Sequence, residues 1–120
     1  MIASGAYGEV FEAVHVEKKY NCVVKMEDRD TPYSVLKIEA QFLRMLNETK
    51  MHGVPTIYSL GRTDKKRYMS MQQLGPSLSH LISFCDNKIS IKTTLMIARQ
   101  VLNRLQDLHK RNIVHSDIKP

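Results

Sequence analysis

Apolar and polar residues alternate in the first part of this chain, and apolar residues recur with helical spacing further on. Residues 9–16 carry valines on one side of a period-two pattern, which predicts a strand. Residues 22–27 form a shorter apolar run and predict another strand, and residues 56–60 and 67–72 predict a hairpin around a charged turn. The pattern therefore favours an antiparallel sheet.

Helical spacing occurs in two longer segments. Residues 33–47 predict a helix, and Ser90 is a plausible N-cap for a long amphipathic helix that extends to Arg111. A further helical pattern begins near Leu78. The apolar stripes expected to face a core are Val35, Ile38, Phe42, Leu43 and Leu46 in the first helix, and Leu95, Ala98, Val101, Leu102, Leu105 and Leu108 in the long one.

The break between these two kinds of pattern is the Gly-Pro segment at residues 74–77. It predicts an α+β protein with a strand-rich part at residues 1–73 and a helical part at residues 74–120. With 120 residues and 42% hydrophobic content, the chain can bury one core but not two independent ones.

Charge and cysteine content exclude several function classes. The net charge is +6, but the 18 Lys and Arg residues are spread along the chain and match no nucleic-acid-binding motif. Cys22 and Cys85 are far apart, so neither a disulfide framework nor a zinc site is expected. No apolar run approaches the roughly 18 residues of a membrane span, and the N-terminus does not resemble a signal peptide. We therefore expect a soluble protein in the reducing cytoplasm or nucleus.

A glycine motif precedes the first long strand, in the form Ala3-x-Gly5-x-x-Gly8. Glycines at this spacing let backbone amides approach a phosphate chain, because no Cβ stands in the way. A strand, not a helix, follows Gly8, which favours a phosphate-covering hairpin over a dinucleotide-binding loop. An ordinary glycine-rich turn between strands is the alternative at this point.

Two charged residues fall among apolar positions. Lys25 lies within the predicted strand at residues 22–27, and Glu39 falls on the apolar stripe of the helix at residues 33–47. An unpaired charge on an apolar surface is unfavourable, so we expect the two to form an ion pair. Alternatively, Lys25 extends to solvent and Glu39 lies at the edge of the stripe.

The loop after the long helix reads His115-Ser116-Asp117-Ile118-Lys119. It is similar to the catalytic loop of protein kinases, in which an Asp follows His-Arg and a Lys comes two residues later. The order of glycine hairpin, strand lysine, helix glutamate, hinge and this loop resembles the eukaryotic protein kinases throughout. The hinge Leu74-Gly75-Pro76-Ser77-Leu78, with Phe84-Cys85 and Ser90-Ile91-Lys92-Thr93, looks like the casein kinase I family.

This resemblance implies a two-lobed kinase fold and the transfer of phosphate from ATP, with Mg²⁺, to Ser or Thr of a protein substrate. Asp117 would be the catalytic base, Lys119 would contact the transferred phosphate, and Lys25 and Glu39 would form the ion pair that positions the lysine. No nucleic-acid or membrane partner is implied. The implied ATP contacts are Gly5 and Gly8 over the phosphates, Val10 and Val23 on the two sides of the adenine, and Met71, Gln72, Gln73 and Leu74 in the gatekeeper and hinge. Ile2 and Lys25 complete the implied ATP-binding set.

The sequence departs from the kinase pattern at three positions. Ala3 replaces the first glycine, Val23 stands where kinases usually have Ala, and Ser116 replaces the Arg of the catalytic loop. The magnesium-binding residues of the family would lie beyond Pro120, so no metal ligand is assigned and residues 1–120 alone are expected to be inactive. The alternative function is a non-catalytic kinase-like binding module.

Overall fold

The computed structural model describes residues 3–5 and 8–120, with side chains from Gly8 onward. The chain divides into two compact units, Met1–Leu74 and Gly75–Pro120. The first contains a sheet and one helix, and the second contains two helices. The predicted α+β class is confirmed.

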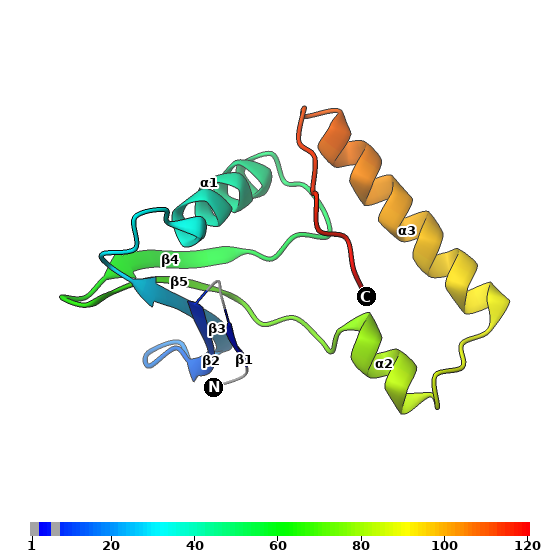
Figure 1. Ribbon diagram of the computed structural model, residues 1–120, viewed down its shortest axis with the longest axis horizontal. Helices are drawn as coiled ribbons and strands as arrows, with labels where there is room; N and C mark the ends of the chain where they lie inside the picture. Colours follow the sequence, from blue (N-terminus) through cyan, green and yellow to red (C-terminus); the bar gives the residue numbers. More distant parts are fainter. Residues whose placement is uncertain (1–2, 6–7) are drawn as a thin grey trace. The chain divides into compact units, whose positions relative to one another are not determined.

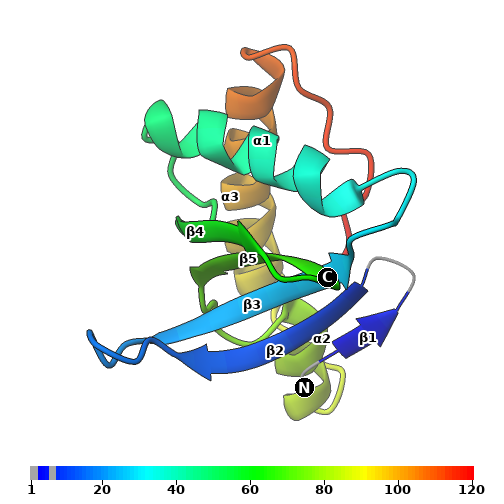
Figure 2. The same cartoon turned by 90° about the vertical axis from the view of Figure 1, so that its left-hand side faces the viewer.

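The first unit is built on a five-stranded antiparallel sheet with the order β1-β2-β3-β5-β4 (Figure 1). Figure 2 shows the strands side by side, with α1 (Val35–Glu48) above β4 in this view. The strands predicted from alternation are all present. Their bounds are β1 Ala3–Gly5, β2 Gly8–Val14, β3 Asn21–Asp28, β4 Ile57–Arg62 and β5 Lys66–Gln72.

The strand predicted over residues 9–16 was too long at its end, because β2 stops at Val14. His15 begins the turn to β3: its N–H donates to the Tyr20 carbonyl at 2.9 Å, and its carbonyl accepts from Lys19 at 2.9 Å. Val16 is consequently outside the strand and 78% exposed. The alternation of valines therefore extends two residues beyond the strand, because the hydrogen bonds of the turn end the pairing of β2 with β3.

The core of this unit lies between the sheet and α1. Leu36 and Ala40 on the helix pack with Val23 on β3 and with Met69 and Met71 on β5. Met69 has no exposed surface. The small Ala40 side chain suits a close approach of the helix to the sheet, because interiors pack without large voids.

The predicted apolar stripe of this helix was wrong at three positions. Val35, Ile38 and Phe42 are 42%, 53% and 46% exposed, whereas Leu36 and Ala40 are buried. Apolar residues occur on two neighbouring sides of α1, and the spacing alone does not say which side meets the sheet. The helix begins after the N-cap Ser34, whose Oγ accepts from the backbone N–H of residue 37 at 3.1 Å.

The second unit contains α2 (Leu78–Phe84) and α3 (Ile91–His109). The predicted N-cap Ser90 is confirmed, since its Oγ accepts from the N–H of Thr93 at 3.0 Å. The helix ends at His109, not at Arg111, because the chain turns at Asn112 (φ 57°). Within the predicted stripe only Leu108 is buried among the described residues. No helix in the described ranges combines the length and apolarity needed to cross a membrane.

Candidate functional site

The predicted ion pair between the strand lysine and the helix glutamate is present. Lys25 Nζ on β3 lies 2.5 Å from Glu39 Oε1 on α1. The side chains are 28% and 34% exposed, so solvent reaches the pair and partly screens its charges. An ammonium group held in this way has donors left for an anionic ligand.

The strand register explains why Lys25 meets the helix. Lys25 lies opposite Val10 on β2 and Met69 on β5. Directly opposed residues of an antiparallel sheet project to the same face, and the buried Met69 belongs to the core that α1 covers. Lys25 is therefore presented to the helix side of the sheet. Glu39 comes three residues after the buried Leu36, so it lies on a neighbouring part of the same helix face and contacts Lys25 on that side of the sheet.

A second carboxylate, Glu27 on β3, holds the start of α1. It is only 7% exposed, and it accepts from the N–H of Leu36 at 3.3 Å and from Nη1 of Arg67 at 3.2 Å. It also accepts a hydrogen bond from Oγ of the N-cap Ser34. Its negative charge lies at the helix N-terminus, where the unpaired backbone N–H groups favour an anion.

Sequence reasoning assigned no role to Glu27. A signal was available, since Glu27 follows Lys25 by two residues and alternation places both on the same face of β3. This carboxylate joins β3 to α1 and β5. We therefore regard it as a positioning residue for the Lys25–Glu39 pair.

The glycine motif forms the closed end of the β1–β2 hairpin, with Gly5 paired to Gly8. Gly8 has φ +104°, and a Cβ at this position would lie 2.2 Å from the carbonyl oxygen of Met26 on β3. Only glycine fits here without strain. The predicted contact Ile2 and residues 6 and 7 lie outside the described residues.

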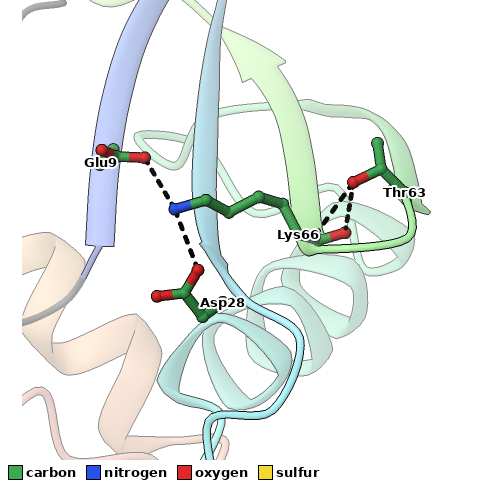
Figure 3. Close-up of polar contacts among 4 residues, drawn as sticks. All are labelled: Glu9, Asp28, Thr63 and Lys66. Atoms are coloured by element: carbon green, nitrogen blue, oxygen red, sulfur yellow. Dashed lines mark hydrogen bonds and ion pairs between the residues drawn. The ribbon is translucent and has the colours of Figure 1, made fainter.

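A lysine bridges two acidic residues beside this hairpin (Figure 3). Lys66 Nζ lies 3.0 Å from Glu9 Oε2 and 3.1 Å from Asp28 Oδ1. The Lys66 ammonium donates to both carboxylates, and these hydrogen bonds, that to Glu9 most strongly, raise the pKa of Lys66 above its usual range. Since Glu9 directly follows Gly8, the bridge ties the start of β2 to the end of β3 and the start of β5. No pattern in the sequence indicated this contact.

The residues implied to contact adenine lie on the same sheet face as Lys25. Val23 and Met71 are directly opposed on β3 and β5 and are 7% and 8% exposed. Val10 is half-buried and packs against the core that they help to form. Their apolar surfaces are thus contiguous with the core beneath α1.

The remaining implied hinge residues continue from the end of β5. Gln72 accepts from the N–H of Thr56 through its side chain at 3.3 Å, and Gln73 donates to Glu12 Oε1 at 3.3 Å. Leu74, the last residue of the first unit, is 60% exposed. The two glutamines therefore hold the end of β5 and the residue after it to β2 and to the residue before β4.

The predicted catalytic loop lies in the second unit. Lys119 Nζ lies 2.7 Å from Asp117 Oδ2, and the backbone N–H of Asp117 donates to His115 Nδ1 at 3.2 Å. The hydrogen bond and the charge of Lys119 hold the pKa of Asp117 below its usual range. Ser116 adopts φ 63°, a left-handed conformation that turns the chain between the imidazole and the carboxylate.

The two units offer charged groups of opposite sign. In the first, Lys25 is a cation next to the glycine hairpin, and in the second, Asp117 is an ionised carboxylate that can accept a hydrogen bond. Among the described residues, no group of three or more His, Cys, Asp or Glu is arranged to hold a metal ion. A family model described as the protein kinase domain matches residues 1–120.

Proposed function

The chain belongs to the protein kinase family, and we propose that it acts as a serine/threonine protein kinase of casein kinase I type. Its antiparallel sheet with α1 is consistent with the upper lobe of the kinase fold. Protein kinases generally transfer the γ-phosphate of ATP to a protein, with Mg²⁺ neutralising charge on the phosphates. The proposal extends this activity to Ser and Thr hydroxyl groups.

The observation that carries the proposal is the ion pair between Lys25 and Glu39. In this proposal Lys25 holds the ATP phosphates while Glu39 keeps the ammonium in place. Phosphoryl transfer depends almost entirely on positioning and charge stabilisation, so a fixed cation is the central requirement. Gly5 and Gly8 then cover the phosphates from the hairpin.

In this proposal the loop residues Asp117 and Lys119 act on the protein substrate and the transferred phosphate. Asp117 accepts the hydrogen bond of the substrate hydroxyl and orients its oxygen toward the phosphate. The Asp117 carboxylate, with a pKa below the usual range for aspartate, is ionised at neutral pH and can accept this hydrogen bond. In this proposal Lys119 contacts the transferred phosphate, and its 2.7 Å contact with Asp117 supports a shared role. The resemblance associates this lysine with Ser/Thr rather than Tyr specificity.

The proposed adenine contacts are Val10 and Val23, with Met71–Leu74 as the gatekeeper and hinge. Val10, Val23 and Met71 share the sheet face of Lys25, which supports the assignment of these three residues. Residues 1–73 are then the upper lobe and residues 74–120 the hinge and the start of the lower lobe.

The experiment is a phosphorylation assay with the protein at its natural length, Mg²⁺, labelled ATP and an acidic Ser-containing protein substrate. We expect label on Ser and Thr. Asp117→Asn should lower kcat about 10²–10⁴-fold and leave ATP affinity within a few fold. Lys18→Met, an exposed lysine in the β2–β3 turn, is the control and should leave both constants unchanged. Near-normal turnover of Asp117→Asn would reject Asp117 as the base.

A binding module without catalysis is the second candidate, and one observation favours it. Val23 is 7% exposed and packs in the core, and in the proposed binding mode a side chain bulkier than Ala would narrow the space for adenine. Equilibrium binding of a fluorescent ATP analogue separates the two functions. Absence of binding, together with absence of phosphate transfer, would support the module, whereas Val23→Ala should strengthen nucleotide binding if crowding is the cause.

A further inference from the structure

A pocket of about 610 Å³ lies in the first unit between α1 and the β4–β5 hairpin, and we call it the α1–β4–β5 pocket. Neither Lys25 nor Glu39 lines it. Its apolar surface comes from Leu36 and Ala40 on the helix, with Leu60 and Tyr68 on the two strands.

A glycine shapes one wall of this pocket. Gly61 on β4 lies under the ring of Tyr68, since a Cβ at this position would be 2.3 Å from Cζ and Oη of Tyr68. With glycine at this position the tyrosine ring can lie close to the backbone of β4. A side chain here would force the ring to move, and Tyr68 itself lines the pocket. The wall is therefore built from a specific pair of residues on adjacent strands.

The rest of the lining is strongly positive. Arg67 is neutralised by the buried Glu27, at 3.2 Å. The other cations make no salt bridge within the part of the chain that the structure describes, and no Asp or Glu lines the pocket there. These exposed cations are Arg29, Lys37, Arg44 and Arg62.

The positions of these cations indicate the kind of anion that they suit. Lys37 and Arg44 are separated by two turns of α1, about 10 Å along the helix axis at 1.5 Å per residue. Arg29 precedes the helix, and Arg62 ends β4. A single phosphate is too small to neutralise cations at this spacing. Several carboxylates spaced along one chain match this spacing, and the pocket of about 610 Å³ between the cations has room for an apolar side chain.

We propose that the α1–β4–β5 pocket binds an acidic peptide segment of a partner protein. An aliphatic or aromatic side chain of the segment packs on Leu36, Leu60 and Tyr68, while flanking Asp or Glu residues pair with the cations of the rim. Guanidinium groups favour such contacts because they bind carboxylates in a bidentate manner. The inference goes beyond phosphoryl transfer and does not depend on it.

The test is fluorescence anisotropy of the full chain with a short labelled peptide in which Asp and Glu flank one phenylalanine. Two matched peptides serve as probes, one with the acids replaced by their amides and one with the phenylalanine replaced by alanine. Both should bind about tenfold more weakly or worse, because each lacks one of the two contacts. Equal binding of all three peptides overturns the proposal.

Variants locate the site. Lys37→Glu combined with Arg44→Glu should weaken binding of the acidic peptide at least about tenfold, whereas the matched reversal Lys18→Glu in the β2–β3 turn should not. Leu60→Asn, at a position 39% exposed, removes apolar contact with little risk to folding and should also weaken binding. Circular dichroism melting confirms that each variant remains folded. Unchanged binding by folded variants of both kinds overturns the proposal.

Two further measurements separate this pocket from the proposed kinase site and from a surface that recognises charge alone. Asp117→Asn should bind the peptide normally even if it transfers no phosphate, because Asp117 does not line the pocket. An oligonucleotide of equal charge should compete poorly, because it offers no side chain for the apolar surface. Competition by the oligonucleotide at the same concentration as the peptide would mean that only charge is recognised, and would overturn the proposal.

Discussion

The Glu27 carboxylate on β3 accepts a hydrogen bond from the backbone N–H of Leu36, in the first turn of α1, with Oε2 and N 3.3 Å apart. The same strand carries Lys25, and the same helix carries Glu39. A buried contact between strand and helix therefore restrains the distance between the members of the ion pair, although Glu27 touches neither of them.

We expect Glu27→Gln to lower the free energy of unfolding by about 1–3 kcal/mol, because the half-buried Arg67 loses its charge partner. Urea denaturation measures this change. Glu17→Gln is the control, since Glu17 is an exposed acid in the β2–β3 turn and should change stability little. The positioning role predicts in addition a lower kcat at temperatures where the variant is fully folded. Unchanged kcat in folded Glu27→Gln would leave Glu27 a purely structural residue.

The Lys25–Glu39 pair should matter more for activity than for stability. Both side chains are about one-third exposed, so their coupling should contribute less than about 1 kcal/mol to unfolding. In the phosphorylation assay described above, with the protein at its natural length, Lys25→Met and Glu39→Gln should each reduce kcat/KM, and the double variant should be little worse than Lys25→Met. Fully additive losses would show that the two residues act independently. A Lys25→Met protein with normal activity would contradict the proposed phosphate contact.

Gly8→Ala should lower the free energy of unfolding by about 2–3 kcal/mol, because the φ of +104° is unfavourable for a residue with a Cβ. The new methyl group would also collide with the Met26 carbonyl oxygen. Gly75→Ala is a matched control, since no atom lies within 4 Å of its added Cβ and its φ is not positive. Urea denaturation of the two variants compares them directly. Equal stability would mean that the hairpin backbone adapts to a side chain.

The Asp117 carboxylate should titrate with a pKa below the usual range for aspartate, because Lys119 donates to it at 2.7 Å. A lowered pKa means that the carboxylate keeps its charge as the pH falls and loses the lysine contact only when it is finally protonated. NMR titration of the Asp117 carboxyl carbon measures the midpoint. Lys119→Gln should raise the midpoint of the Asp117 titration. Lys110→Gln, at the C-cap of α3, is the control and should leave the midpoint unchanged. An unmoved midpoint in Lys119→Gln would exclude the pair as the cause.

Ser116→Arg tests whether the loop requires the arginine found in most kinases. The residue adopts φ 63°, and Ser and Arg both carry a Cβ, so the substitution adds no backbone strain. The loop is already held by the contacts of Asp117 with His115 and Lys119. We therefore expect kcat to change less than about threefold in steady-state assays. A large gain would show that the missing Arg limits activity.

The sequence by itself determined the α+β class, the strands, the Lys25–Glu39 contact and the cap at Ser90. These features depend on local patterns: alternation, helical spacing, capping side chains, and the unfavourable free energy of an unpaired charge near apolar surface. The kinase family also followed from motifs in their order along the chain.

Only the tertiary structure decided which side of α1 is buried, and that Glu27, Lys66 and the α1–β4–β5 pocket have roles at all. The sides of α1 differ little in apolar content, and contact with Met69 selects the one that carries Leu36 and Ala40. Glu27 and Arg67 are 40 residues apart in sequence, and Lys66 and Glu9 are 57 apart. Such pairs leave no periodic trace, because their distance is set by strand order and register and not by spacing along the chain.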